Sequence, residues 1–204
     1  MSNFEIRQDE NGIGNVLILK GKWTDDVSSY MQKKGIFALR LTDSFGFKGH
    51  DISFLSKLSF LRSLEVYCWE ARGVKVIESL PQLEVIGLQY KSAQKVDLSA
   101  FSKLRVALVT WSKGLGSLLE VSSLEKLNIQ NYPHINLMPI SSMHGLKKLY
   151  LTSRKLESLN GIENLSKLEL LDLYNCPNLL SLTGTESCHN LKKIEVEACN
   201  RVCA

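Results

Sequence analysis

The chain has 204 residues, 44% of them apolar and 23% charged, with a formal net charge of +4. This composition is ordinary for a soluble globular protein, and no apolar run reaches the roughly 20 residues that a membrane-spanning helix needs. The 25 basic and 21 acidic residues are interspersed, whereas a nucleic-acid binder usually concentrates basic charge on one face.

The first predicted element is a β-hairpin over residues 1–20. The segment FEIRQDENGIGNVLILK reads as an alternating strand, an Asp-Glu-Asn-Gly turn and a second strand. We expect this hairpin to cover the open end of the element that follows it. The first residues also lack the basic and apolar segments of a secretory signal, so we expect either a cytoplasmic protein or one whose signal has been removed, and we favour the first.

An internal repeat with the motif L-x-x-L-x-L follows and merges with the hairpin. Successive copies are separated by 23, 25, 22, 21, 20, 22, 22 and 23 residues. The nine copies begin at Ile13, Ile36, Leu61, Leu83, Leu104, Leu124, Leu146, Leu168 and Leu191. The copies from Ile13, Ile36 and Leu104 are weaker; the first has Val16 and Ile18 in its core positions. The spacing predicts one domain over residues 1–204 with about nine repeats of 20–25 residues.

Each repeat reads as a short strand followed by a turn and a return segment. Alternate side chains of a strand point to opposite faces, so the leucines of x-L-x-L point into the core. One repeat cannot bury its apolar side alone, and neighbouring repeats must therefore stack. The sequence predicts an α/β repeat solenoid with one parallel sheet.

The stretch LESLNGIENLSKLELLDLYNCPNL, residues 156–179, resembles the short repeats of bacterial leucine-rich-repeat proteins, the internalin class. The resemblance covers residues 13–204 and implies a curved solenoid with the parallel sheet on its concave face. In this family the residue three after the last strand leucine is often Asn or Cys, buried in the turn. Of the nine such turn positions, only Cys176 and Cys199 match.

The strand positions between the core residues predict a second face, open to solvent. Aromatic side chains there stand among polar and acidic ones, a composition typical of protein-binding surfaces. We select Arg40, Glu65, Tyr67, Tyr90, Trp111, Asn128, Gln130, Tyr150, Asp172, Tyr174, Glu195 and Glu197 as candidate partner-binding residues. Tyr90 and Trp111 are alternatively core residues at the turn edge. The acidic C-terminal end favours a protein partner with a basic patch.

The sequence contains only weak matches to known catalytic and ligand-binding motifs. The glycine pairs Gly12–Gly14 and Gly114–Gly116 do not complete a dinucleotide-binding motif. Cys188, His189, Cys199 and Cys203 are close in sequence but contain no C-x-x-C, so we predict no metal and no cofactor. The odd count of five cysteines suits reduced thiols in a reducing compartment.

We therefore expect a non-catalytic protein-binding module that acts through its concave face, in the concrete form of a bacterial immunity protein neutralising a toxin. The alternatives are a secreted or surface effector of internalin type, and an enzyme with an acidic C-terminal site at Asp172, Glu195 and Glu197. Nucleic-acid binding and binding through the convex face are the further rivals.

Overall fold

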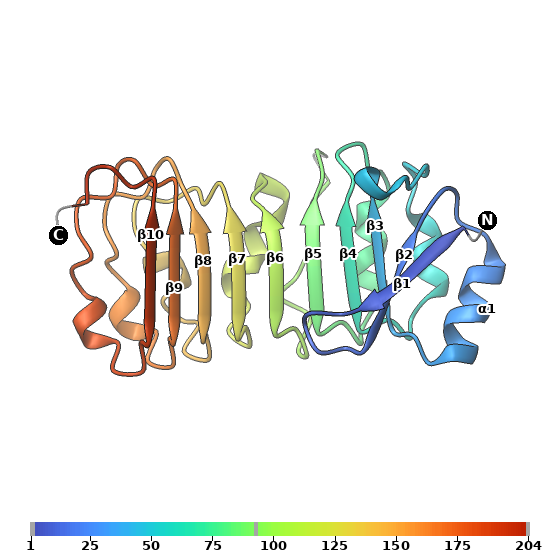
Figure 1. Ribbon diagram of the computed structural model, residues 1–204, viewed down its shortest axis with the longest axis horizontal. Coiled ribbons are helices and arrows are strands. Elements are labelled where there is room, and N and C mark those ends of the chain that lie inside the picture. The colour runs from blue at the N-terminus through green and yellow to red at the C-terminus, as the bar shows by residue number, and fades with distance from the viewer. Residues whose placement is uncertain (1–2, 92–93, 203–204) are drawn as a thin grey trace. The chain divides into compact units, whose positions relative to one another are not determined.

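The computed structural model describes residues 3–91 and 94–202 (Figure 1). Its internal contacts group into two compact units. Unit 1 comprises residues 1–104 and 112–116, and unit 2 comprises residues 105–111 and 117–204. Within each unit the strands follow one another in chain order.

Unit 1 is built from five strands and the segments that connect them. Its elements are β1 (Phe4–Gln8), β2 (Asn15–Leu19), α1 (Asp25–Lys34), β3 (Ala38–Thr42), η1 (Asp43–Phe45), η2 (Ser53–Lys57), β4 (Ser63–Tyr67), η3 (Val74–Ser79) and β5 (Val85–Gln89). β1 pairs with β2 antiparallel, and β2 to β5 pair in parallel. The predicted N-terminal hairpin is therefore confirmed.

Unit 2 repeats the same pattern with shorter helical turns. Its strands are β6 (Val106–Thr110), β7 (Lys126–Gln130), β8 (Lys148–Thr152), β9 (Leu170–Tyr174) and β10 (Lys193–Glu197), all paired in parallel. Its 3₁₀ turns are η5 (Met138–Ile140), η6 (Ile162–Asn164) and η7 (Thr185–Ser187), and η4 (Lys113–Glu120) begins in unit 1 and ends in unit 2.

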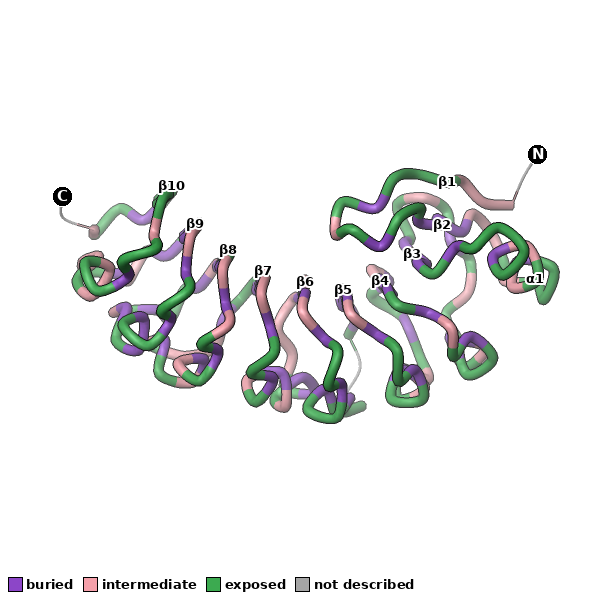
Figure 2. The backbone as a smooth tube through the Cα atoms, turned by 90° about the horizontal axis from the view of Figure 1, so that it is seen from below, coloured by how far each residue is buried: buried purple, intermediate pink, exposed green. Residues whose placement is uncertain are grey.

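The core lies between the strands and the return segments, as the repeat predicts. Leu149 and Leu171 are aligned on neighbouring strands and are fully buried. The return segments supply the opposing layer, for example Leu165, and Figure 2 shows the buried stretches alternating with exposed bends. Burial of such side chains stabilises each repeat by about 1.5–3 kcal/mol per residue.

The register of the first repeat differs from the prediction. Leu17 and Leu19 align with Leu39 and Leu41 on the core face, so Val16 and Ile18, which we expected in the core, point to the other face. All four residues of β2 from 16 to 19 are nevertheless buried. Val16 and Ile18 are buried because the hairpin folds over the face to which they point.

We call this face, opposite the leucine-bearing one, the polar face; its central column holds Arg40, Glu65 and Gly87 in unit 1. In both views β1 and the hairpin turn pass over β2 and β3 on the side away from the helical return segments (Figures 1 and 2). The hairpin thus covers the polar face of unit 1, and its strand β1 also pairs with the outer edge of β2, which covers the open end of the first repeat as predicted.

Three of the five turns that follow the strands of unit 2 share a backbone conformation. Asn131, Asn175 and Ala198 adopt the left-handed conformation, with φ of 58°, 53° and 55°. Each directs the next side chain into the interior, where Cys176 and Cys199 lie buried. The backbone N–H of Cys176 donates to Cys199 Sγ at 3.3 Å. The two predicted turn cysteines are thus buried and in contact.

Candidate functional site

An ion pair dominates the polar face of unit 1. Arg40 Nη2 lies 2.8 Å from Glu65 Oε1 on the neighbouring strand, and Glu65 is only 1% exposed. Burial lowers the pKa of the Arg40 guanidinium, but the hydrogen bond and the charge of Glu65 together outweigh burial and raise that pKa above its ordinary value. Both residues were predicted to contact a partner; here they hold neighbouring strands together.

Tyr67 extends this buried network. Burial, followed by the charge of Glu65 and a hydrogen bond to it, raises the pKa of the Tyr67 hydroxyl. Space for the ring comes from β5: a Cβ atom at Gly87 would lie 2.5 Å from Tyr67 Oη and 2.8 Å from Glu65 Cγ. The glycine in the polar column is thus the reason that Tyr67 can lie over β5.

The hairpin turn places two carboxylates over the network. Asp9 is 3% exposed, and its Oδ2 accepts a hydrogen bond of 3.0 Å from the backbone N–H of Ile13. The charge of Asp9 acts on Tyr67 and the charge of Glu10 acts on Arg40. The charges of the turn therefore act on two residues that the sequence analysis selected as binding candidates.

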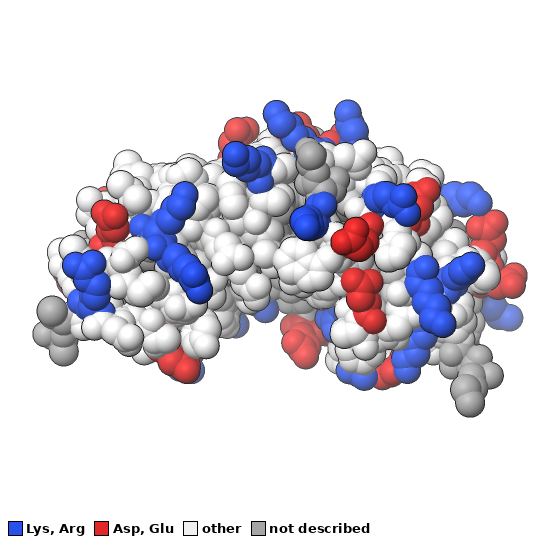
Figure 3. All heavy atoms as spheres, turned by 90° about the horizontal axis from the view of Figure 1, so that it is seen from above, with Lys and Arg blue, Asp and Glu red and all other residues white. Residues whose placement is uncertain are grey.

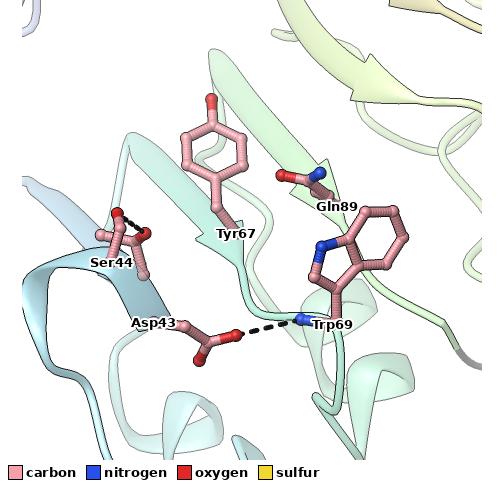
Figure 4. A pocket seen from close by; sticks show the side chains of 6 residues that line it. Asp43, Ser44, Tyr67, Trp69 and Gln89 are labelled. Carbon is pink, nitrogen blue, oxygen red and sulfur yellow. Dashed lines mark hydrogen bonds between the residues drawn. The ribbon is translucent and has the colours of Figure 1, made fainter.

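A pocket of about 350 Å³ remains open in unit 1 where β3, β4 and β5 end (Figure 4). Thr42, Asp43, Ser44, Tyr67, Trp69 and Gln89 line it. Asp43 Oδ2 accepts a hydrogen bond of 3.3 Å from the backbone N–H of Trp69, and Thr42 Oγ1 lies 2.9 Å from Ser44 Oγ. The indole of Trp69 is 48% exposed. Of the lining residues, only Tyr67 was a candidate from the sequence.

Trp69 could have been found from its place in the repeat. It occupies the turn position that holds the buried Cys176 and Cys199 in later repeats. In this turn the preceding residue, Cys68, is buried instead, and the side chain of Trp69 is exposed. No comparable sequence pattern distinguishes Asp43, because acidic residues are common directly after strands.

On the polar face of unit 2, the predicted columns of side chains are accessible to solvent. Asn128, Tyr150, Asp172 and Glu195 align across four strands. In the adjoining column Tyr174 aligns with Glu197 and is 48% exposed. Lys126 Nζ lies 5.8 Å from the centre of the Tyr150 ring, within cation–π range. Gln130 is exposed and accepts a hydrogen bond of 3.2 Å from Thr110 Oγ1.

Acidic charge accumulates at the β9–β10 end of this face. Partial burial is the main cause that raises the pKa of Asp172, and the charges of Glu195 and Glu197 add to it. Lys193 acts in the opposite sense and forms an ion pair of 2.7 Å with Glu195. Lys193 thus interacts with the carboxylates of Glu195 and Asp172.

Tyr90 and Trp111 belong neither to the buried network of unit 1 nor to the acidic group at the β9–β10 end of unit 2. Tyr90 is 4% exposed, and its hydroxyl donates to the Gln94 carbonyl at 3.4 Å. Trp111 is half-buried and meets His134 edge-on at 6.3 Å between ring centres. Tyr90 is therefore a core residue, which was the alternative interpretation of its position.

The remaining surface offers little for other chemistry. On the face drawn in Figure 3, Lys and Arg side chains are scattered among Asp and Glu. Within residues 3–91 and 94–202, no three His, Cys, Asp or Glu side chains group closely enough to hold a metal ion. In the same residues no helix has the length and apolarity needed to span a membrane.

The arrangement of parallel strands with return segments on one side defines the leucine-rich-repeat fold. Internalin C2 of Listeria monocytogenes has a similar structure, with a TM-score of 0.64, 18% identity and coverage of 89% of this chain and 80% of that one. The internalin InlF of the same organism follows with a TM-score of 0.55, 14% identity and coverage of 83% and 56%. No protein-family model and no curated protein matches the sequence.

Proposed function

We propose that the chain is a non-catalytic protein-binding module whose polar face in unit 2 binds a protein with a basic patch. The observation that carries this proposal is the exposed ring of Tyr174, which stands beside the carboxylates of Asp172 and Glu197. An aromatic side chain with few rotatable bonds loses little entropy on binding, and acidic neighbours select for a basic partner.

The proposed binding surface contains fewer residues than the set of partner-binding candidates selected from the sequence. It comprises Asn128, Gln130, Tyr150, Asp172, Tyr174, Glu195 and Glu197. The buried residues Glu65 and Tyr90 lie outside it, and Arg40 is engaged by Glu65. Rigid strands hold these side chains in place before the partner arrives, which reduces the entropy cost of binding.

The test is calorimetric titration of a partner isolated by pull-down against matched variants. We expect Tyr174→Ala and Tyr150→Ala each to weaken binding about 30-fold, equivalent to about 2 kcal/mol. Met138→Ala is the control, because Met138 is an equally exposed apolar side chain (53%) on the return segment. If Met138→Ala abolishes binding and both tyrosine variants bind normally, the return-segment face is the interface and the proposal fails.

Asp172→Asn separates binding from stability. The pKa of Asp172 is raised, so the folded chain binds a proton more readily than the unfolded chain, and stability falls as the pH rises through the folded pKa. At neutral pH the charged form therefore destabilises the fold. We expect Asp172→Asn to raise the melting temperature at pH 7 while slowing association with a basic partner. A variant with lower stability and unchanged association would contradict both expectations.

Within this proposal, the particular role that we favour is a cytoplasmic immunity protein that neutralises a toxin. The four described cysteines are free and buried, which suits a reducing compartment. The structural likeness to internalins favours a second role, a secreted or surface effector. A toxin gene beside this one, with inhibition of its product by the purified chain, would support the first role; binding to a host-cell protein instead would support the second.

A further inference from the structure

The pocket of unit 1 lies outside the surface proposed above, and its lining has a distinct chemistry. Trp69 and Tyr67 supply two aromatic rings, and Asp43 supplies a carboxylate (Figure 4). Gln89, Thr42 and Ser44 add an amide and two hydroxyls. Aromatic rings beside a carboxylate favour a cation, because the ring faces and the carboxylate are both negative.

The carboxylate of Asp43 is positioned by the protein. It accepts from the Trp69 backbone N–H at 3.3 Å, and it lies close enough to Cys68 to help raise the pKa of that thiol, to about 12, although burial is the larger cause. Among the residues that the structure describes, none forms an ion pair with Asp43. A carboxylate has about four lone-pair sites, so acceptor capacity remains for a ligand.

The size of the pocket limits what can enter. Its volume of about 350 Å³ is near the lower bound of ligand pockets, which run from about 300 to 1,000 Å³. This suits one protein side chain. A planar guanidinium can stack on the indole and donate two parallel hydrogen bonds to a carboxylate at the same time, whereas an ammonium acts as a point charge.

We propose that the pocket formed by Asp43, Tyr67 and Trp69 binds an arginine side chain of a protein partner. The inference rests on the proposed protein-binding function, because the arginine belongs to that partner. It adds a second contact on unit 1, where the hairpin leaves the ends of β3, β4 and β5 uncovered.

The test uses N-acetyl-arginine methylamide as the probe and the indole N–H resonance of Trp69 in NMR as the readout. The chain has three tryptophans, and Trp69→Phe assigns the resonance. We expect the Trp69 signal to shift with millimolar probe while the signals of Trp23 and Trp111 stay fixed. Asp43→Asn should weaken the probe about tenfold, a typical loss for a charged hydrogen bond.

N-acetyl-citrulline methylamide is the matched control, since it has nearly the same shape without the charge. Equal shifts from the citrulline and arginine probes, or no shift of Trp69 with either, overturn the inference. An unchanged thermal melt of Asp43→Asn shows that a weaker shift does not reflect unfolding. This titration involves no protein partner. A negative result with the probe therefore does not affect the test of protein binding with Tyr174→Ala, and a negative result with Tyr174→Ala does not affect the probe titration.

Discussion

Arg40 and Glu65 lie opposite each other on β3 and β4 and form an ion pair of 2.8 Å under the N-terminal hairpin. Their side chains are 23% and 2% exposed. Glu65 is therefore shielded from water, and loss of Arg40 would leave its buried charge uncompensated.

We expect Glu65→Gln to lower the free energy of unfolding by about 2–3 kcal/mol, somewhat less than for a fully buried pair because Arg40 is partly solvated. Urea denaturation measures the change. The double variant Arg40→Met with Glu65→Leu is the control and should be close to wild type, because it removes both charges together. Equal losses in both variants would show that packing, not charge, stabilises this layer.

Gly87→Ala tests whether the polar face of unit 1 is tightly packed. A new Cβ would lie 2.5 Å from Tyr67 Oη, so the ring must move. We expect a lower melting temperature, with a destabilisation of about 1–3 kcal/mol, typical of overpacking. Gly116→Ala is the matched control because nothing lies within 4 Å of its Cβ position. A Gly87 variant as stable as the Gly116 variant would contradict the packing described here.

Ala198→Gly should stabilise the chain. The φ of Ala198 is 55°, a conformation that costs an alanine about 1–2 kcal/mol. Glycine removes this strain but loses more entropy on folding, about 0.4–1 kcal/mol. We expect a net gain of about 0.5–1 kcal/mol in thermal or urea unfolding. Ala100→Gly, at an exposed site without positive φ, should do the opposite.

The burial of Cys176 in the turn after β9 predicts that alkylating reagents modify its thiol slowly. Burial and the neighbouring Cys199 raise the pKa of the Cys176 thiol from 9.0 to about 12. At pH 8 the thiolate fraction is thus about a thousandfold below that of an ordinary thiol. Mass spectrometry after iodoacetamide should find Cys176 unmodified in the folded chain and modified in urea. Rapid modification of folded Cys176 would contradict its burial.

The same shift implies a dependence of stability on pH. As the pH rises above 9.0 the unfolded thiol releases its proton, while the folded thiol retains its own until about pH 12. The free energy of unfolding should therefore fall across this window. Cys176→Ala should show a shallower fall in denaturant titrations at successive pH values. Cys203 lies outside the described residues.

The repeat could be predicted from the sequence because β7, β8 and β9 each alternate buried leucine or isoleucine positions with more exposed ones. Leu149 and Leu171 are fully buried, whereas their neighbours Tyr150 and Asp172 are partly exposed. The register of β2 could not be predicted, because Val16 to Leu19 are all apolar and both faces of the strand are buried. The alternation of apolar and polar residues cannot indicate the register of a strand when neither of its faces is exposed to water.

The candidate site was predicted in part for a similar reason. Position in a repeat places Tyr150 and Tyr174 on the polar face, and they lie there. Glu65 occupies an equivalent position, but its exposure depends on where the hairpin folds, and no local pattern encodes that contact. The pocket depends on three strand ends that converge only in the folded chain.

β10 also bears on how the chain behaves in concentrated solution. Ile194 and Val196 are 41% and 39% exposed, and exposed apolar side chains on an outer strand favour pairing with strands of other molecules. Lys193, Glu195 and Glu197 alternate with them and are exposed as well. Charged side chains on an outer strand oppose this kind of aggregation through repulsion and hydration, and salt weakens the repulsion. The solubility of the protein should therefore depend on ionic strength.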